Sequence, residues 1–71
     1  MTLGQMLKEF RKKKGITQSQ AAEFLGWTTQ YYARFEKDQL IPTEYNYKKF
    51  SSLLNVSITE FKKMMQKFEK E

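Results

Sequence analysis

Long polar side chains gather between residues 28 and 34, and no other stretch of the chain is better suited to recognising a ligand. Gln30 and Arg34 stand four residues apart, so a helix would present their amide and guanidinium groups on one face. An amide can pair bidentately with adenine and a guanidinium with guanine, whereas the hydroxyl of Thr28 can bond a base. Taken alone, such a polar helix face is equally typical of residues that are merely solvated, so its meaning depends on the motif that contains it.

The composition argues against catalysis and metal binding. The 71 residues include no histidine and no cysteine, which removes the commonest general base and the commonest metal ligands. We therefore assign no catalytic residue, no metal ligand and no cofactor. The net charge of +5 at pH 7 favours an anionic partner, either nucleic acid or an anionic membrane.

Length and hydropathy narrow the choice of partner. No apolar run approaches the roughly 18 residues of a membrane span, and no signal-peptide pattern opens the chain. We therefore expect a cytoplasmic protein without a membrane partner. A chain of 71 residues is expected to form a single domain, residues 1–71, whose thin core favours dimerisation or very regular helix packing.

The polar face lies in a stretch that predicts two short helices joined by a tight turn. Thr17 and Gln20 form a capping-box pattern that begins the first helix, and Gly26 ends it. Thr28 is suited to cap the second helix, which runs to about residue 36. Its inward positions would be Tyr32 and Phe35, which leaves the polar residues on the opposite side.

Three further helices are predicted, at about residues 3–13, 43–54 and 58–68. Each carries apolar residues at helical spacing. Asp38 tolerates a positive φ, and Asn55 is suited to end a helix. The predicted fold class is therefore all-α, with five helices.

The stretch TQSQAAEFLGWTTQYYARFE resembles the helix-turn-helix of the lambda repressor and Cro family of DNA-binding regulators. The matching features are the TQ opening, Ala22 beneath the turn, Gly26 in the turn, and Arg34 with Glu36 near the end of the second helix. The similarity continues through Pro42 and the NVSITEF stretch, so it covers nearly the whole chain. It implies a five-helix lambda-repressor-like DNA-binding domain with its helix-turn-helix at about residues 17–36.

The resemblance implies which residues contact DNA. Carried over by position, the base contacts fall on Thr28, Thr29, Gln30, Ala33 and Arg34. The phosphate contacts fall on Thr17, Gln18, Tyr31 and Lys37. Two alternatives stay open, because polar residues on a helix face can be merely solvated and Tyr31 can be an aromatic packed on its neighbour.

Two structural roles also follow from the resemblance. Arg11 and Glu36 stand where the family often forms an ion pair, which would fix the second helix of the motif relative to the first helix of the chain. Trp27 occupies a turn position that the family usually gives to a branched aliphatic residue, and we interpret its indole as part of the core.

The last helix carries more apolar residues than a small core needs. We assign Phe61 to the core of the protomer. Met64, Met65 and Phe68 lie further along the stripe and are predicted to form a two-fold dimer interface, since methionine adapts its shape to such surfaces.

Two functions are compatible with these features. The leading hypothesis is a sequence-specific transcriptional regulator that binds double-stranded DNA as a homodimer. The expected form is a small Cro-like repressor that occludes a promoter at a near-palindromic operator. The alternative is a protein-interaction module on the same fold, such as an antitoxin or anti-repressor with a protein partner. The tyrosines and the uncharged residues 39–41 favour the alternative, whereas the basic charge and the Gln30 and Arg34 pair favour DNA.

Overall fold

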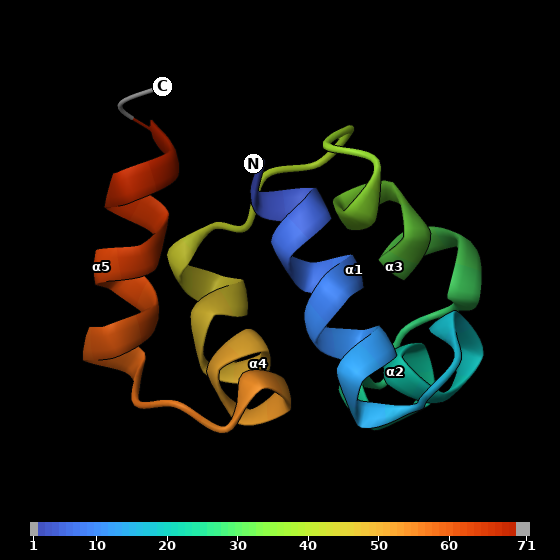
Figure 1. Cartoon of the computed structure of the whole chain (residues 1–71). Helices are drawn as coiled ribbons and strands as arrows, with labels where there is room; N and C mark the ends of the chain where they lie inside the picture. The colour runs from blue at the N-terminus through green and yellow to red at the C-terminus, as the bar shows by residue number, and fades with distance from the viewer. Residues whose placement is uncertain (1, 70–71) are drawn as a thin grey trace. The chain divides into compact units, whose positions relative to one another are not determined.

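The computed structural model describes the backbone of residues 2–69 and the side chains of residues 2–67. Five helices follow one another along the chain (Figure 1): α1 spans Leu3–Lys14, α2 Gln18–Leu25, α3 Thr29–Glu36, α4 Glu44–Leu54 and α5 Ile58–Glu69. Every regular element within residues 2–69 is an α-helix, which confirms the predicted all-α class and its five helices. The chain forms two compact units, one with α1, α2 and α3 and the other with α4 and α5.

Local hydrogen bonds explain where α1 and α2 begin. The hydroxyl of Thr2 accepts from the backbone N–H of Gln5 at 3.2 Å, and the Gln5 amide oxygen accepts from the N–H of Thr2 at 2.8 Å. Thr17 and Gln20 repeat this reciprocal arrangement at 3.1 and 2.8 Å. Both capping boxes are formed, the one at Thr17 and Gln20 as predicted, so each helix start is determined by residues that are neighbours in the sequence.

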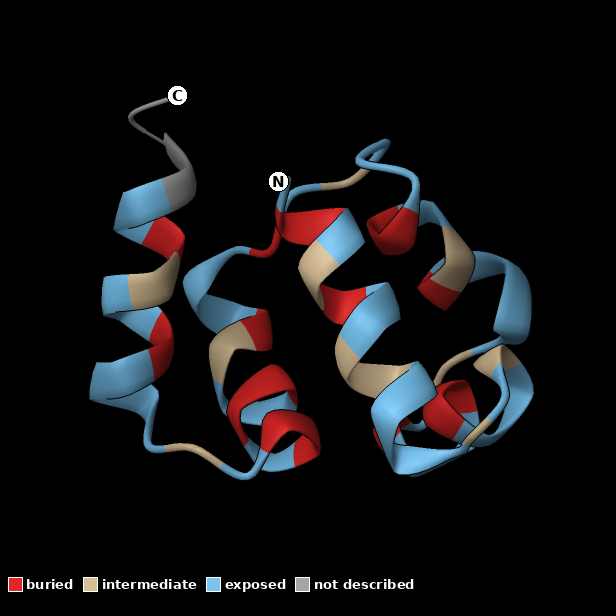
Figure 2. Ribbon diagram, in the orientation of Figure 1, coloured by how far each residue is buried: buried red, intermediate tan, exposed pale blue. Residues whose placement is uncertain are grey.

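The core of the first unit lies where α1 and α2 each pack against α3 (Figure 2). Its buried apolar residues are Leu3, Leu7, Ala21, Ala22, Leu25, Tyr32 and Phe35. The predicted inward positions of α3 are confirmed, because Tyr32 and Phe35 are almost completely enclosed. Burying this side of α3 leaves its polar side to solvent.

Trp27 differs from its predicted place in the core. Its side chain is only half-buried, and its ring stacks on Phe35 with the centroids 5.3 Å apart. Tyr31 meets the same indole edge-on at 5.0 Å. The indole is too large for the turn to enclose, so one part covers Phe35 while another part stays accessible to solvent.

Gly4 allows the backbones of α1 and α3 to touch, a role that the sequence analysis did not foresee. A Cβ atom at this position would lie 2.8 Å from both the carbonyl carbon of Glu36 and the carbonyl oxygen of Phe35, and closer still to the carbonyl oxygen of Glu36. Real Cβ atoms essentially never approach backbone atoms so closely. Any larger residue would therefore push the start of α1 away from the end of α3.

Asp38, in the loop that follows α3, also stabilises the contact between the end of α3 and the start of α1. Its backbone has the predicted positive φ, 60°, and its carboxylate accepts hydrogen bonds from the N–H of Gly4 at 2.9 Å and from the hydroxyl of Thr2 at 2.6 Å. The carboxylate thus satisfies a free N–H at the beginning of α1, where a negative charge also complements the helix dipole.

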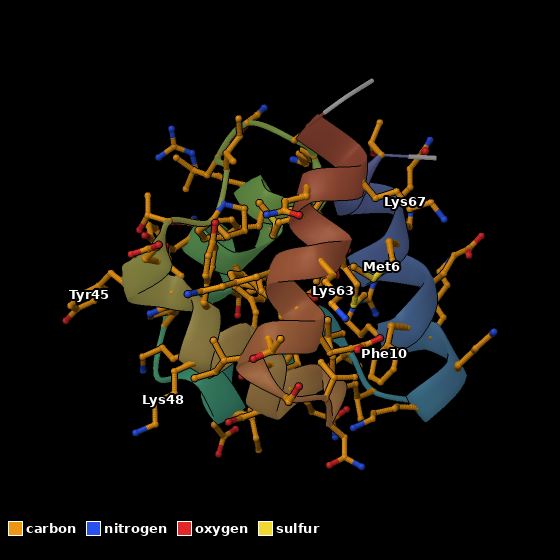
Figure 3. The ribbon with its side chains drawn as sticks, turned by 90° about the vertical axis from the view of Figure 1, so that its left-hand side faces the viewer. Met6, Phe10, Tyr45, Lys48, Lys63 and Lys67 are labelled. Atoms are coloured by element: carbon orange, nitrogen blue, oxygen red, sulfur yellow. The ribbon has the colours of Figure 1, made fainter. Side chains whose placement is uncertain are left out.

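The second unit is organised around Phe61 of α5, which is fully buried as predicted. Phe50 stacks on it with the centroids 5.9 Å apart, and Tyr47 meets its ring edge-on at 5.3 Å. On the outer side of α4, the Tyr45 side chain is 86% exposed and projects into solvent (Figure 3). The unit therefore has one aromatic core and leaves other large side chains uncovered.

The predicted dimer residues have different environments in this unit. Met65 is buried with 3% of its surface exposed, so its side chain belongs to the core of the chain and does not form an open interface. Met64 is partly exposed and stays a candidate for dimer contact. The side chain of Phe68 lies outside the described residues.

Candidate DNA-binding site

Hydrogen bonds on both sides of the turn fix α3 relative to α2. Gly26 adopts a left-handed conformation, with φ 78°, which glycine reaches without steric cost. The N–H of Trp27 donates to the carbonyl of Ala22 at 2.9 Å, which closes the end of α2. The hydroxyl of Thr28 then accepts from the N–H of Tyr31 at 3.1 Å and begins α3, as predicted.

The five residues predicted to contact bases lie on the accessible part of this motif. Thr28, Thr29, Gln30 and Arg34 are exposed, and Ala33 is partly exposed. The buried Tyr32 and Phe35 hold the helix from the other side. α3 therefore offers an amide, a guanidinium, hydroxyls and a methyl group on a backbone that is fixed beforehand.

The residues predicted to contact phosphate have mixed surroundings. Thr17 and Lys37 are exposed, and Tyr31 has 38% of its surface exposed. Gln18 is half-buried, and its amide nitrogen already donates to Glu36 at 3.0 Å. Gln18 thus contacts α3 in the free chain, which leaves one N–H and the carbonyl oxygen of its amide for another partner.

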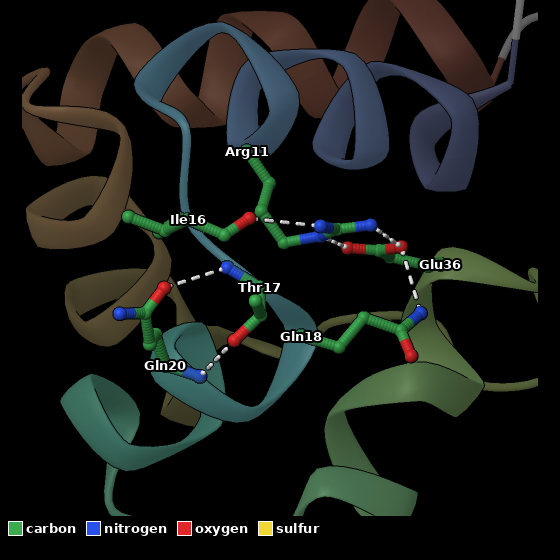
Figure 4. Close-up of polar contacts among 6 residues, drawn as sticks. All are labelled: Arg11, Ile16, Thr17, Gln18, Gln20 and Glu36. Carbon is green, nitrogen blue, oxygen red and sulfur yellow. Dashed lines mark hydrogen bonds and ion pairs between the residues drawn. The ribbon is translucent and has the colours of Figure 1, made fainter.

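A buried ion pair connects the elements around the motif (Figure 4). Arg11 Nε donates to Glu36 Oε2 at 2.7 Å, and Arg11 Nη2 donates to Oε1 at 3.3 Å. The guanidinium also donates through Nη1 to the carbonyl of Ile16 at 2.9 Å. The side chains are only 11% and 2% exposed, so the predicted pair is present and is shielded from water.

With Gln18 included, this network joins α1, the connection to α2, α2 itself and α3. The carboxylate of Glu36 receives donors from both Arg11 and Gln18. Tyr32 lies beside the pair, with its hydroxyl buried and without a hydrogen-bond partner among the described residues. The ion pair was predicted from the sequence, but the Gln18 contact was not, because no local sequence pattern indicates it.

The environment of Glu36 favours its ionised form. Burial alone would raise the pKa of this carboxyl, but hydrogen bonds from Arg11 and other neighbours outweigh burial and hold the pKa below its ordinary value. The same contact raises the pKa of Arg11. Burial, together with the Glu36 carboxylate, raises the pKa of Tyr32. The pair is thus fully charged and the phenol neutral at neutral pH.

Acid is expected to weaken the fold through Glu36. Because the pKa of Glu36 is lowered in the folded state, its contribution to stability is complete above the ordinary glutamate pKa of about 4.3 and is lost as the pH falls through the folded value. Urea denaturation between pH 7 and pH 2.5 gives the free energies of unfolding of the wild type and of Glu36→Gln. The difference between these two free energies measures the contribution of the Glu36 charge and should shrink below about pH 4.3.

The exposed Glu23 offers a matched control for that titration. Glu23→Gln should follow the wild type over the same pH range within about 0.5 kcal/mol. A constant difference between the wild type and Glu36→Gln at every pH would contradict the lowered pKa of Glu36.

Two other kinds of site were sought in the part of the chain that the structure describes. Among the side chains of residues 2–67 no three or more acidic or metal-ligating groups come together as a metal site would require. None of the helices in this range combines the length and the apolar character needed to cross a membrane.

Comparison with known proteins decides the family. Residues 7–61 match the helix-turn-helix family. The chain belongs to this family. Membership confirms the resemblance to the lambda repressor and Cro group, and with it a DNA-binding domain of transcriptional regulators.

Two curated helix-turn-helix proteins of Bacillus subtilis (strain 168) are similar to the chain. The HTH-type transcriptional regulator ImmR is 42% identical over 57 residues, which are 80% of this chain and 45% of ImmR. The SPbeta prophage-derived uncharacterized HTH-type transcriptional regulator YonR is 40% identical over 58 residues, 82% of this chain and 53% of YonR. The chain thus spans about half the length of these relatives. No solved structure matches it.

Proposed function

We propose that this helix-turn-helix chain binds a specific sequence in double-stranded DNA by placing α3 in the major groove. The observation that carries the proposal is the exposed polar side of α3, which includes Gln30 and Arg34. The buried ion pair between Arg11 and Glu36 fixes this helix to α1. Base readout needs bidentate donors on a rigid backbone, and this helix combines both.

Each residue that was predicted to contact DNA has a role in the proposed complex. Gln30 would pair with adenine and Arg34 with guanine, while Thr28, Thr29 and Ala33 would contact neighbouring base edges and thymine methyl groups. Thr17, Gln18, Tyr31 and Lys37 would contact phosphates. The charge of +5 would supply attraction to any duplex, on which the base contacts then impose selectivity.

The proposal extends to a homodimer that represses transcription by covering a promoter at a near-palindromic operator. Dimers of helix-turn-helix proteins read two half-sites about one helical turn apart. Of the two predicted interface residues whose side chains the structure describes, Met64 is the one that remains partly exposed, and it is our candidate for the dimer contact.

Selection of bound duplexes from a random library tests the class of function directly. The proposal expects an enriched consensus made of two inverted half-sites, centred about 10 base pairs apart. Enrichment of a single half-site would support DNA recognition and contradict the dimer, whereas no enrichment over the starting library would overturn sequence-specific binding.

Substitutions on α3 provide a second test. Gln30→Ala and Arg34→Ala are each expected to cost about 1–3 kcal/mol on the selected duplex and to relax the preference at one base pair. Lys37→Ala should instead weaken all duplexes by a similar factor and reduce the salt slope by about 1. Fluorescence anisotropy against a panel of single-base variants measures both effects. Unchanged affinity and an unchanged consensus in both alanine variants would exclude α3 as the reading helix.

Exposed apolar side chains favour a second candidate function, a module that binds a partner protein. Phe24, Ile41 and Tyr45 are 62%, 72% and 86% exposed. Affinity for DNA falls steeply with salt because bound counterions are released, whereas an apolar protein interface responds weakly. A flat salt response in the binding measurements would therefore favour the protein partner.

A further inference from the structure

Three aromatic rings form a cluster where the turn meets α3. Trp27 and Phe35 lie nearly parallel, at 19° with their centroids 5.3 Å apart. Tyr31 stands at 85° to both, 5.0 Å from Trp27 and 5.3 Å from Phe35. Edge-to-face contacts at these distances are favourable, so the Tyr31 ring is held by two partners at once.

The three members of this cluster differ in exposure. Phe35 is buried, Trp27 is half-buried and Tyr31 keeps 38% of its surface accessible to solvent. The backbone of Tyr31 is also fixed, because its N–H donates to the Thr28 hydroxyl at the start of α3. The cluster thus restrains a tyrosine that is still open to a ligand.

We propose that Trp27 is a positioning residue for Tyr31, and that the hydroxyl of Tyr31 so held donates a hydrogen bond to a phosphate of duplex DNA. The inference rests on the proposed DNA-binding function. A phenol on the first turn of α3 suits a phosphate oxygen, which requires a single donor and no bidentate match to a base. An aliphatic residue at position 27 would offer no aromatic face for the Tyr31 ring.

The expected gain in affinity for DNA comes from fixing the Tyr31 side chain before the complex forms. A side chain immobilised only on complex formation weakens affinity by about two- to tenfold. Trp27 and Phe35 impose that restriction in the free protein. Replacing Trp27 should therefore matter for DNA binding only while the Tyr31 hydroxyl is present.

A double-mutant cycle on the selected duplex tests this dependence. Tyr31→Phe keeps the ring and is expected to lower affinity about tenfold on every duplex, since the lost partner is a charged phosphate. Trp27→Leu should lower affinity about two- to tenfold in the wild-type background and leave it unchanged when combined with Tyr31→Phe. Trp27→Phe, which retains an aromatic ring, should recover most of the loss.

Three controls separate positioning from general damage to the fold. Tyr45→Phe removes the hydroxyl of the 86% exposed tyrosine on α4 and should leave affinity unchanged. Because Trp27 is the single tryptophan, an unaltered emission spectrum in Tyr31→Phe would show that the ring cluster is intact. Urea denaturation of every variant corrects affinity for any unfolded fraction.

The outcomes distinguish the two proposals from each other. Wild-type protein that prefers no duplex would overturn the proposed function itself. A wild type that binds selectively, with Tyr31→Phe at full affinity or with losses that multiply in the double variant, would overturn the positioning role alone. If Trp27→Leu does not fold, Trp27→Val takes its place in the cycle, and full affinity of Tyr31→Phe remains sufficient to reject the inference.

Discussion

Replacing Arg11 with methionine is expected to lower the free energy of unfolding by about 3–5 kcal/mol, because it leaves the buried Glu36 carboxylate without its cation. The pair is 2.7 Å apart and its side chains are 11% and 2% exposed, so water cannot replace the lost partner. The guanidinium also bonds the carbonyl of Ile16, which loses a donor in the same variant. Urea denaturation at pH 7 measures the loss.

Two further variants show whether the loss comes from the unpaired charge. Lys12→Met makes the same kind of change at the exposed neighbouring position and should alter stability by less than about 0.5 kcal/mol. Arg11→Met combined with Glu36→Leu removes both charges and should recover much of the loss. An Arg11→Met variant within about 1 kcal/mol of the wild type would contradict the assigned role of the pair.

Gly4→Ala is expected to destabilise the fold by about 2–3 kcal/mol, although the same change in an ordinary helix stabilises by about 1 kcal/mol. The sign is reversed because the new Cβ would meet backbone atoms of Phe35 and Glu36, which cannot move aside as a flexible side chain can. Thermal and urea denaturation of the variant measure the change.

Gly15→Ala supplies the comparison at the opposite end of the same helix, α1. A Cβ at Gly15 would have no neighbour within 4 Å, but the residue has a φ of +71°, so only the backbone cost of about 1–2 kcal/mol applies. The two glycines therefore test separate causes of destabilisation: Gly4 tests the close approach of two backbones, and Gly15 tests the left-handed backbone conformation. Stabilisation by Gly4→Ala would show that α1 and α3 do not touch in solution.

The features predicted from the sequence depend on residues that are close together along the chain. Thr17 and Gln20 begin α2 through contacts across three residues, and Gly26 and Asn55 end helices with positive φ as expected. The exposed side of α3 followed from helical periodicity in the same way. Such local rules suffice to predict the helices and the exposed side of α3, whereas the assignment of that side to DNA came from the resemblance to the lambda repressor and Cro family.

The features that were missed depend on residues far apart in the sequence. The Asp38 carboxylate bonds Gly4 and Thr2 across more than thirty residues, and Gln18 reaches Glu36 on another helix. A glycine within the helical pattern at position 4 was a signal of close backbone approach. Trp27 and Met65 were misplaced for a related reason, since periodicity identifies an apolar side but does not tell how completely neighbours cover each ring or thioether.

The contacts that join α3 to α1 gather at the C-terminal end of α3, around Glu36 and Asp38, whereas Thr29 and Gln30 lie at its opposite end. Eight residues of helix are about 12 Å long. A rotation of α2 and α3 together by about 5° about this end would move the first turn of α3 sideways by about 1 Å, more than the tolerance of about 0.5 Å for a bidentate contact. If α3 reads base edges as we propose, small changes at the junction with α1 would therefore alter which base pairs are favoured while the helices themselves stay folded.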